Sequence, residues 1–383
     1  MPLPVLLFGV VVVAVVLVLL AQGVPILLAY QMPRLDPPAG PPAGAAPPAP
    51  RLSVIVAARN EEEDLPGTLD GLLAQDYPDL EILVVDGGST DRTREVVRAR
   101  EPRVRLLVEP PLPSGWVGKN YGCHLGAAAA TGTRLLFLDA DVRCHPSAVR
   151  AAAVWMEATG ADLVSLAPRL VAESFWERTV LPFYLQMVLL YFRAPRTNRD
   201  GSRAALANGQ FWMTSRAAYA RVGGHAAVRG YVLEDIQIAR NYRRAGLRLR
   251  LAWAPELLAT RMYRDRHEMF EGLLKNIHGT DYAAGRQAAL LAGLLGLYAL
   301  PLALLPYGIL VGDGPLTALG ALLVAALFLK HVAFARVAVG RGRYGLLFPL
   351  AVGFYAALLL ASLAPLRRSR SVRWKGREYP IRP

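Results

Sequence analysis

Hydrophobic residues are distributed very unevenly along this chain. Four long stretches consist almost entirely of apolar side chains: residues 3–30, 290–312, 315–338 and 346–365. Each stretch is long enough to cross a bilayer core of about 30 Å as a helix. The region between them, residues 51–280, alternates short apolar and polar segments, which is typical of a globular domain. The pattern therefore predicts a globular domain between membrane-embedded ends.

Within the globular region, short apolar runs alternate with segments of helical character. The runs predict buried strands at residues 52–58, 80–85, 104–108 and 134–138, and the other segments predict helices at residues 61–73, 92–100 and 120–130. Alternation of this kind is typical of the α/β fold class, in which helices cover both faces of a mostly parallel sheet.

Residues 1–30 are predicted to form an uncleaved N-terminal transmembrane anchor. No Lys or Arg precedes the apolar run, and the run is longer than the roughly 7–15 residues of a signal-peptide core. A cleaved signal peptide is the alternative. Residues 31–50 are rich in Pro and Ala and predict a spacer. The other segments are the globular domain at 51–285, the C-terminal transmembrane segments at 286–366 and a basic tail at 367–383.

Basic residues give conflicting signals about topology. Arg34, Arg51 and Arg59 follow the anchor and predict a globular domain on the cytoplasmic side of the inner cell membrane, in a multi-pass protein. Three full spans after that domain would export the basic tail, although Lys and Arg favour the cytoplasm. One apolar segment is therefore expected to be re-entrant or interfacial, and residues 290–312, which two prolines interrupt, are the first candidate.

The chain has 383 residues, of which 54% are hydrophobic, and a formal net charge of +13. Basic residues beside apolar segments suit anionic lipid headgroups. The sequence contains no nucleic-acid-binding motif, so the membrane is the expected partner and nucleic acid is not. Cys123 and Cys144 give no disulfide framework, and their spacing from His124 and His145 fits no zinc pattern. We expect both thiols to serve in ordinary packing.

The fourth predicted strand ends in Asp139-Ala140-Asp141. Because residues i and i+2 of an extended strand share one face, both carboxylates are expected to emerge together. They would do so at the carboxyl end of a strand, where open α/β sheets bind their ligands. Carboxylate pairs of this kind hold Mg²⁺ or Mn²⁺ against a diphosphate, so a metal site is predicted here.

A second acidic pair, Glu234-Asp235, lies much further along the chain. A carboxylate at this position could take the proton of an attacking hydroxyl group as a general base. The alternative is an ordinary acidic first turn of a helix, which the helix dipole stabilises.

Together with three further motifs, these pairs resemble glycosyltransferase family 2, whose members have the GT-A fold. The likeness covers about residues 51–280 and follows the family's order. The five motifs are Ala57-Ala58-Arg59-Asn60-Glu61, Asp86-Gly87-Gly88-Ser89-Thr90-Asp91, Gly115-Trp116-Val117-Gly118-Lys119, Asp139-Ala140-Asp141 and Glu234-Asp235. Gly87 stands where the family usually has a second aspartate.

This resemblance implies an inverting transfer from a nucleotide-diphospho-sugar, with a UDP-sugar as the expected donor and Mg²⁺ or Mn²⁺ as the cofactor. The implied nucleotide-sugar site comprises Ala57, Arg59, Glu61, Asp86, Lys119 and Asp139. The implied metal ligands are Asp141 and Asp139, and Asp235 is the implied catalytic base beside Glu234. For Lys119, the alternative to a phosphate contact is a solvated loop lysine.

Four motifs narrow the likeness to membrane glycosyltransferases that modify carotenoids, such as the hydroxychlorobactene glucosyltransferase group. They are Gly115-Trp116-Val117-Gly118-Lys119-Asn120, Asn208-Gly209-Gln210-Phe211, Arg261-Met262-Tyr263 and Trp374-Lys375-Gly376-Arg377. This likeness implies a role in carotenoid biosynthesis and a lipid acceptor, either a carotenoid or a related terpenoid with a hydroxyl or carboxyl group. The implied acceptor contacts are Trp116, Gln210 and Trp212, with simple packing as the alternative for Trp116.

The Gln-x-x-Arg-Trp motif of processive polysaccharide synthases does not follow Asp235, which indicates transfer of a single sugar. The alternatives for function are transfer to a polyprenyl phosphate or a glycerolipid, a non-catalytic membrane scaffold or polysaccharide-export component, and a transporter. Residues 175–193 predict either a core helix or a helix in the membrane plane. Lys330 and His331, inside one predicted span, form either a functional pair or side chains that reach the interface.

Overall fold

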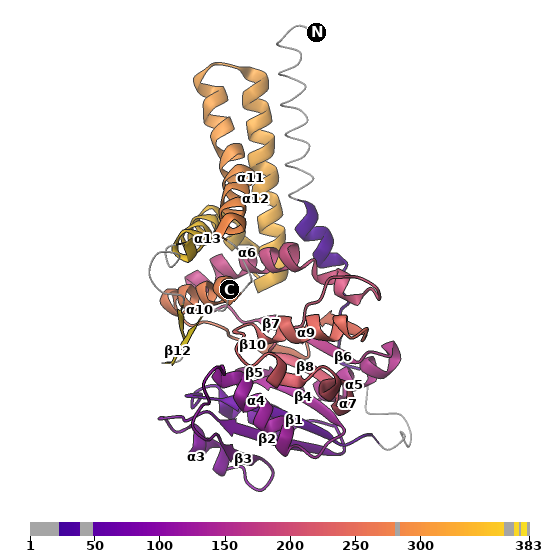
Figure 1. Cartoon of the computed structure of the whole chain (residues 1–383). Coiled ribbons are helices and arrows are strands. Elements are labelled where there is room, and N and C mark those ends of the chain that lie inside the picture. The colour runs from indigo at the N-terminus through magenta and orange to yellow at the C-terminus, as the bar shows by residue number, and fades with distance from the viewer. Residues whose placement is uncertain (1–22, 39–48, 280–283, 364–370, 375–376, 381–383) are drawn as a thin grey trace. The chain divides into compact units, whose positions relative to one another are not determined.

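The computed structural model describes residues 23–38, 49–279, 284–363, 371–374 and 377–380 (Figure 1). Most of the predicted anchor, the middle of the predicted spacer and part of the basic tail lie outside these residues. The chain forms two compact units. The sheet unit comprises Met32–Val171, Phe192–Met262 and Ser371–Pro383, and the helical unit comprises Met1–Gln31, Ala172–Tyr191 and Tyr263–Arg370.

The sheet unit is built around a seven-stranded sheet with the strand order β3-β2-β1-β4-β8-β6-β9. Its strands are β1 (Leu52–Ala58), β2 (Leu80–Asp86), β3 (Arg105–Val108), β4 (Arg134–Asp139), β6 (Leu163–Ala167), β8 (Phe211–Ser215) and β9 (Leu249–Trp253). The strand β8 pairs antiparallel with both neighbours, and the other pairs in this sheet are parallel. The mostly parallel α/β sheet that the sequence predicts is confirmed.

Shorter elements complete the sheet unit. A second sheet contains β5 (Val142–Cys144), β10 (Leu258–Thr260) and β7 (Arg169–Leu170), and β11 (Ser371–Trp374) pairs with β12 (Arg377–Pro380). The helices are α2 (Leu65–Leu73), α3 (Thr93–Arg98), α4 (Gly118–Ala129), α5 (Ala148–Thr159), η1 (Ala194–Asn198), α7 (Arg216–Arg221), α8 (Gly224–Ala227) and α9 (Glu234–Arg244).

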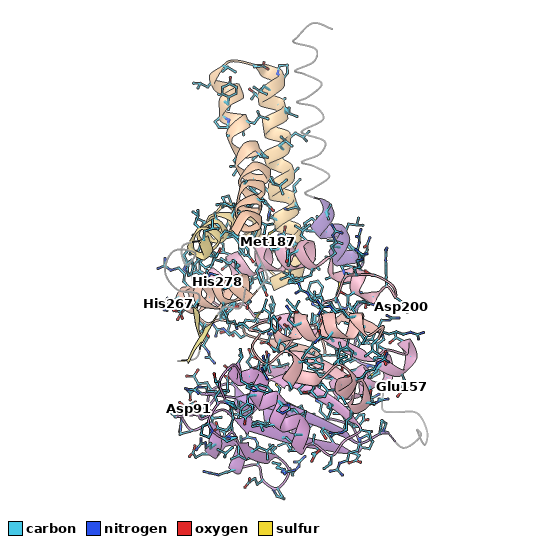
Figure 2. All side chains as sticks on the ribbon, in the orientation of Figure 1. Asp91, Glu157, Met187, Asp200, His267 and His278 are labelled. Carbon is cyan, nitrogen blue, oxygen red and sulfur yellow. The ribbon has the colours of Figure 1, made fainter. Side chains whose placement is uncertain are left out.

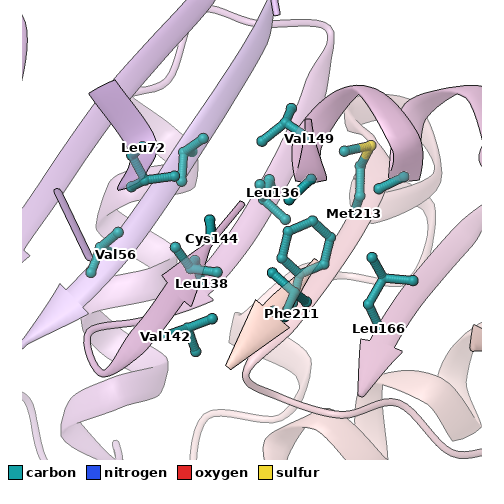
Figure 3. Packing of buried hydrophobic residues seen from close by; sticks show 14 of the residues in the cluster. Val56, Leu72, Leu136, Leu138, Val142, Cys144, Val149, Leu166, Phe211 and Met213 are labelled. Carbon is teal, nitrogen blue, oxygen red and sulfur yellow. The ribbon is translucent and has the colours of Figure 1, made fainter. Parts of the chain in front are cut away.

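Both faces of the large sheet are buried by apolar side chains. Along β1, Val54 and Val56 pack on one face, and Ile55 between them packs on the other. The strand β4 repeats this alternation, with Leu136 on the first face and Phe137 on the second. Figure 3 shows the cluster on the first face. Burial on both faces explains why these strands are continuous apolar runs rather than alternating ones.

The four predicted strands agree with the structure to within one residue at each end. The helix expected at residues 61–73 begins later, at Leu65. Pro66 has no backbone N–H and is tolerated only in the first turn of a helix, so a helix that contains it cannot begin as early as residue 61. In the loop before the helix, the backbone N–H of Glu61 donates to the Thr93 hydroxyl at 2.8 Å. This hydrogen bond holds the residues before Leu65 against the neighbouring loop at the edge of the sheet.

The helical unit contains α6 (Phe175–Phe192), α10 (Arg266–Gly279), α11 (Ala284–Leu310), α12 (Gly314–Val339), the 3₁₀ helix η2 (Gly342–Leu347) and α13 (Phe348–Leu363). Two segments among the described residues are long and apolar enough to cross a membrane, Gly314–Val339 and Gly342–Leu363. A bent pair of segments in α11, Ala288–Ala299 with Pro301–Leu310, is a third candidate. The 43° bend falls at Pro301, which lacks the backbone N–H that a continuous helix requires.

Close contact between α11 and α12 depends on glycine. The two helices run side by side as a hairpin (Figure 1). A Cβ atom at Gly308 would lie 2.7 Å from the Thr317 backbone, and one at Gly320 would lie 2.6 Å from the Leu305 backbone. Small residues at such positions let helix backbones approach closely within a membrane.

Lys330 and His331 on α12 are buried, with 6% and 3% of their surface exposed. Lys330 Nζ donates to the Tyr298 hydroxyl at 3.2 Å, and the His331 ring stacks on Phe348 at a centroid distance of 4.2 Å. These contacts hold both side chains inside the helix cluster. The alternative in which they reach toward an interface is therefore wrong.

Candidate functional site

Two of the predicted motifs meet where β1 and β2 end side by side, with Ala58 opposite Asp86. Asp86 is fully buried, and its carboxylate accepts hydrogen bonds from the backbone N–H groups of Gly88 and Ser89, both at 3.2 Å. Arg94 Nε donates to the same carboxylate at 2.6 Å. Asp86 therefore fixes the turn that follows β2.

The loop after β1 interlocks with this turn. The backbone N–H of Asn60 donates to Ser89 Oγ, and Asn60 Oδ1 accepts from the backbone N–H of Thr90, both at 2.9 Å. Arg59 Nη1 donates to the Gly87 carbonyl oxygen, also at 2.9 Å. The structure thus brings the predicted nucleotide-site residues Arg59 and Asp86 onto two mutually bonded loops.

The remaining residues of this predicted set lie along the same edge of the sheet. Ala57 stands opposite Val85 on β2 and opposite Asp139 on β4. Glu61 follows in the loop that the Thr93 hydroxyl anchors. Ala57 therefore connects the β1–β2 loops to the acidic end of β4.

Glu109 enters this region although the motifs do not include it. A Cβ atom at Gly87 would lie only 3.0 Å from Glu109 Oε2. Glu109 directly follows β3, and its backbone N–H donates to the Asp86 carbonyl oxygen at 3.0 Å. At the position where the family usually has a second aspartate, this chain thus brings in a carboxylate from the neighbouring strand. The signal in the sequence was an acidic residue directly after a predicted parallel strand.

Lys119 joins two acidic motifs that lie far apart in the sequence. Its Nζ atom lies 2.6 Å from Asp139 Oδ1 and 2.9 Å from Glu234 Oε1. Lys119 is in the first turn of α4, Asp139 ends β4 and Glu234 begins α9. Burial opposes the charge on Lys119, but the negative charges of Asp139 and Glu234 raise its pKa well above the ordinary value. The alternative of a solvated loop lysine is therefore wrong.

Asp235 lies next to this cluster and makes two backbone hydrogen bonds. Its Oδ2 accepts from the Gly209 N–H and its Oδ1 from the Ile236 N–H, both at 2.8 Å. Burial and the charge of Glu234 raise the pKa of Asp235 to about 7, against the opposing effects of Lys119 and the two N–H groups. A carboxyl group with this pKa can exchange a proton near neutral pH, as a general base must.

Gly209 is the point at which these groups meet. A Cβ atom on Gly209 would lie 3.0 Å from Asp235 Oδ2 and 3.2 Å from Lys119 Nζ. The loop that carries Gly209 directly precedes β8, and the next carbonyl oxygen, that of Gln210, accepts from the Asp139 N–H at 3.1 Å. One loop thus holds Asp235 and Asp139 in place through backbone groups.

Asp141 lies in the turn between β4 and β5, beyond the end of the strand. The expectation that an extended strand puts both aspartates on one face is therefore wrong in its geometry. Asp141 Oδ2 instead accepts from Thr260 Oγ1 at 3.1 Å, and Gln210 Nε2 lies 3.5 Å from the same hydroxyl. Asp139 and Asp141 thus both connect to Gln210 and its loop.

Asp139 and Asp141 are the carboxylates at this edge that could bind a divalent cation. No group of three or more His, Cys, Asp or Glu side chains suited to a metal ion occurs among the residues that the structure describes. Mg²⁺ commonly uses one or two carboxylates together with substrate phosphates and water. Asp139 and Asp141 fit a cation that binds together with a diphosphate.

Asn120 ties the lysine-bearing helix to the segment before α9. It is fully buried, and its Nδ2 atom donates to the carbonyl oxygens of Val228 and Tyr231, both at 2.9 Å. The backbone N–H of Val117 donates to the Arg229 carbonyl oxygen at 2.7 Å. Lys119 and Glu234 therefore sit on two segments that are fastened together. The motif comparison included Asn120 but gave it no such role.

The three predicted acceptor contacts have different surroundings. Trp212 on β8 is 1% exposed and stacks on Phe137 at a centroid distance of 4.2 Å. Its assignment as an acceptor contact is wrong, because its indole ring fills the core beneath the sheet. Gln210 borders the site, as described above. Trp116, in the loop before α4, is half-buried and packs beside Tyr121 and His124 at about 5.2 and 5.1 Å.

Cys123 and Cys144 are buried free thiols. Burial raises the pKa of both groups, that of Cys144 to about 12. Such thiols remain protonated and serve as small packing groups, as the sequence predicts.

Comparison with protein families gives a match between residues 53–223 and the family described as glycosyl transferase family 2. The chain is also similar to 4,4'-diaponeurosporenoate glycosyltransferase from Staphylococcus aureus. For strain MRSA252 the identity is 26% over 336 residues, which cover 86% of this chain and 88% of the relative. For strain USA300 the identity is 25% over 335 residues with the same coverage.

Two solved structures show a weaker likeness. A mannosyltransferase from Pyrobaculum calidifontis in complex with GDP-Man and Mn²⁺ has 21% identity and a TM-score of 0.49, covering 88% of this chain and 97% of its own. Glucosyl-3-phosphoglycerate synthase from Mycobacterium tuberculosis, in complex with Mn²⁺, UDP and phosphoglyceric acid, has 21% identity and a TM-score of 0.44. That match covers 66% of this chain and 87% of the synthase.

Proposed function

We propose that this glycosyltransferase, whose residues 53–223 form a family 2 domain, moves one sugar from a nucleotide-diphospho-sugar to a lipid with inversion at the anomeric carbon. The observation that carries the proposal is the meeting of Lys119, Asp139, Glu234 and Asp235 at one edge of the sheet. The non-catalytic scaffold has no support from this arrangement, because the acidic motifs are intact and lie together.

The donor is proposed to bind over the loops that follow β1 and β2, beside Ala57, Arg59 and Asp86. These loops are fixed by their own hydrogen bonds, so they offer a preformed surface to the nucleotide. A UDP-sugar such as UDP-glucose is the first donor to test. Lys119 is placed at the acidic end of β4, where its ammonium group would face the diphosphate of such a donor.

In the proposed reaction, an acceptor oxygen attacks the anomeric carbon from the face opposite the leaving nucleoside diphosphate. The new carbon–oxygen bond forms as the bond to the diphosphate breaks, and Asp235 takes the proton of a hydroxyl acceptor. Asp139 and Asp141 would hold Mg²⁺ or Mn²⁺, which would offset the negative charge that develops on the diphosphate. The Gly209 and Ile236 N–H groups keep the Asp235 carboxylate in one orientation.

The acceptor is proposed to be a carotenoid or a related terpenoid with a hydroxyl or carboxyl group. The Staphylococcus aureus relatives, which match over most of their length, are named for a carotenoid-type acceptor. Apolar helices in the same chain suit an acceptor that is dissolved in the membrane. We further propose a multi-pass protein of the inner membrane, with its sheet unit in the cytoplasm. Transfer to a polyprenyl phosphate or a glycerolipid is the second candidate.

Nucleotide release tests this proposal. The full-length protein in detergent is given UDP-glucose, Mg²⁺ or Mn²⁺, and a lipid extract with or without carotenoids. UDP release that requires the carotenoid fraction, with a glycosylated carotenoid found by mass spectrometry, supports the first acceptor. Release with a carotenoid-free extract supports the second. A folded protein that releases no nucleotide from any common nucleotide-sugar would overturn the proposed donor chemistry.

The dependence of activity on pH distinguishes the two acceptor groups. For a hydroxyl acceptor, we expect kcat/KM to fall about tenfold per pH unit below pH 7, because the base form of Asp235 becomes scarce there. For a carboxylate acceptor, which has already lost its proton, the profile should stay nearly flat through pH 7. Initial rates with a matched alcohol and acid of one carotenoid measure this difference. Identical profiles for both acceptors would contradict a base role for Asp235.

A further inference from the structure

The composition of α13 is compatible both with a helix that crosses the membrane and with one that lies in the membrane plane. Together with η2 it forms a 22-residue segment, Gly342–Leu363, that is apolar enough to cross a membrane. Leu350 and Leu360 on this helix are 48% and 57% exposed, so apolar side chains face outward near both of its ends. The contacts on its other side determine whether a crossing is physically reasonable.

The helix α10 follows α13 over much of its length. The ring of Phe270 meets the ring of Phe354 at a centroid distance of 5.6 Å, and His278 contacts the Ser362 backbone. The two contacts are separated by eight residues on each helix, so the helices run alongside each other in the same direction. Figure 2 labels His267 and His278 toward the two ends of α10, and Figure 1 shows α13 next to the base of the α11–α12 hairpin.

The helix α10 is too polar to lie in the hydrocarbon core. Its charged residues are Arg266, Glu268, Glu271 and Lys275. If α13 crossed the bilayer, its middle would lie near the bilayer centre and would take α10 and these charges with it. Charged side chains at that depth are costly, and within membrane segments they are rare.

Aromatic and cationic groups also mark the middle of α13 as interfacial. Phe354 contacts the Trp176 ring of α6 at 5.9 Å, and the Arg266 guanidinium lies over the same Trp176 ring at 5.6 Å. Just before α13, the guanidinium of Arg178 lies over the ring of Tyr344 in η2, 5.6 Å from its centroid. Tryptophan, tyrosine and arginine gather where membranes meet water. The centre and the start of α13 are therefore expected at the same depth in the membrane.

The strands after α13 limit the number of membrane crossings. The strands β11 and β12, which follow α13, belong to the same compact unit as the large sheet. The chain therefore leaves the sheet unit before α10 and returns to it after α13, which requires an even number of membrane crossings. Arg341 and Arg343 precede α13, whereas the turn between α11 and α12, residues 311–313, has no Lys or Arg. That charge distribution suits a hairpin with its turn on the far side.

We propose that α11 and α12 cross the membrane as a hairpin and that α13 lies in the membrane plane beside α10. Its apolar outer face, with Leu350 and Leu360, would be covered by lipid acyl chains, and the basic residues beside it would meet anionic headgroups. This assignment replaces the sequence-based expectation that residues 290–312 form the re-entrant segment. It does not depend on the proposed reaction.

Depth measurements on the full-length protein in liposomes of zwitterionic and anionic phospholipid test the assignment. A nitroxide is attached in turn to Leu350→Cys and Leu360→Cys, in a background with Cys123→Ala and Cys144→Ala. We expect the two labels at the same depth, whereas a crossing helix would separate them by about 15 Å. Leu322→Cys and Leu329→Cys on α12 provide the matched control, with an expected separation of about 10 Å. Separation of the α13 labels by about the crossing value would overturn the proposal.

Labelling of intact cells with a membrane-impermeant maleimide provides a second measurement. Single cysteines replace Asp313, Arg341 and Ser369 in the same background. We expect reaction at position 313 only from outside, and reaction at positions 341 and 369 only after the membrane is opened. External labelling at 369 would mean that α13 crosses. External labelling at 341 but not at 313 would mean that α11 is re-entrant, and either result rejects the proposal.

Discussion

Replacing Asp235 with asparagine is expected to lower kcat for a hydroxyl acceptor by about 10²–10⁴-fold, the usual contribution of a positioned general base. Asparagine has nearly the same shape, and its oxygen can still accept one of the two backbone hydrogen bonds. It cannot take a proton, so the loss should appear in kcat and not in donor affinity. Steady-state kinetics, with donor binding measured by calorimetry, separates the two effects.

Asp200→Asn is the matched control for this substitution. Asp200 is an exposed surface carboxylate that pairs with Arg250 at 2.8 Å and with Arg248 at 3.8 Å. Its variant should keep the wild-type rate and melting temperature within error. If Asp235→Asn turned over a hydroxyl acceptor as fast as Asp200→Asn, Asp235 would not be the base. A large loss with the alcohol but a small loss with the acid would identify the same residue as a base that only alcohols need.

Replacing Asp141 with asparagine is expected to reduce activity by about 10²–10⁴-fold, because a catalytic cation contributes several kcal/mol at the leaving group. The amide oxygen can still accept a hydrogen bond from the Thr260 hydroxyl, so the turn should remain folded. The loss is one negative charge at one of two proposed ligands. We therefore expect Mn²⁺ to tighten nucleotide binding to the wild type but to have little effect on binding to the variant.

Calorimetric titration of UDP, with and without Mn²⁺, measures this coupling without relying on turnover. Asp200→Asn again supplies the control, since it removes a carboxylate of the same type from the protein surface. Equal stimulation of nucleotide binding by Mn²⁺ in Asp141→Asn and in the wild type would rule out Asp141 as a ligand. In that event Asp139 and other groups would have to hold the cation.

Sequence patterns recovered β1, β2, β3 and β4, because each is an apolar run with polar ends, but they did not identify β6, β8 and β9. They did not predict the position of β8, which lies antiparallel between β4 and β6 although it comes after both in the chain. No local sequence pattern shows that a strand will pair between two strands that precede it in the chain. The apolar run Phe211-Trp212-Met213 did carry a signal, since it indicates a buried strand and hence a buried Trp212.

The site shows the same division between local and long-range information. Motifs identified the acidic residues, because these residues end a strand, lie in the turn after one or begin a helix. They could not show that Lys119 joins Asp139 to Glu234, since that contact depends on how α4 and α9 pack. The motifs also contain Gly209 and Asn120, but they gave neither residue its structural role. Their roles come from the space they leave and the carbonyl groups they bind, not from a reactive side chain.

The single ammonium group of Lys119 has a consequence for the charge balance of the resting enzyme. The carboxylates of Asp139 and Glu234 both pair with this one ammonium group, and the carboxyl group of Asp235 lies beside it. Such a surface repels a bare diphosphate, which is itself an anion. Electroneutrality therefore favours a donor that arrives already complexed with its cation. In kinetic terms, the true substrate would be the cation–nucleotide complex, and nucleotide alone would be a weak competitor.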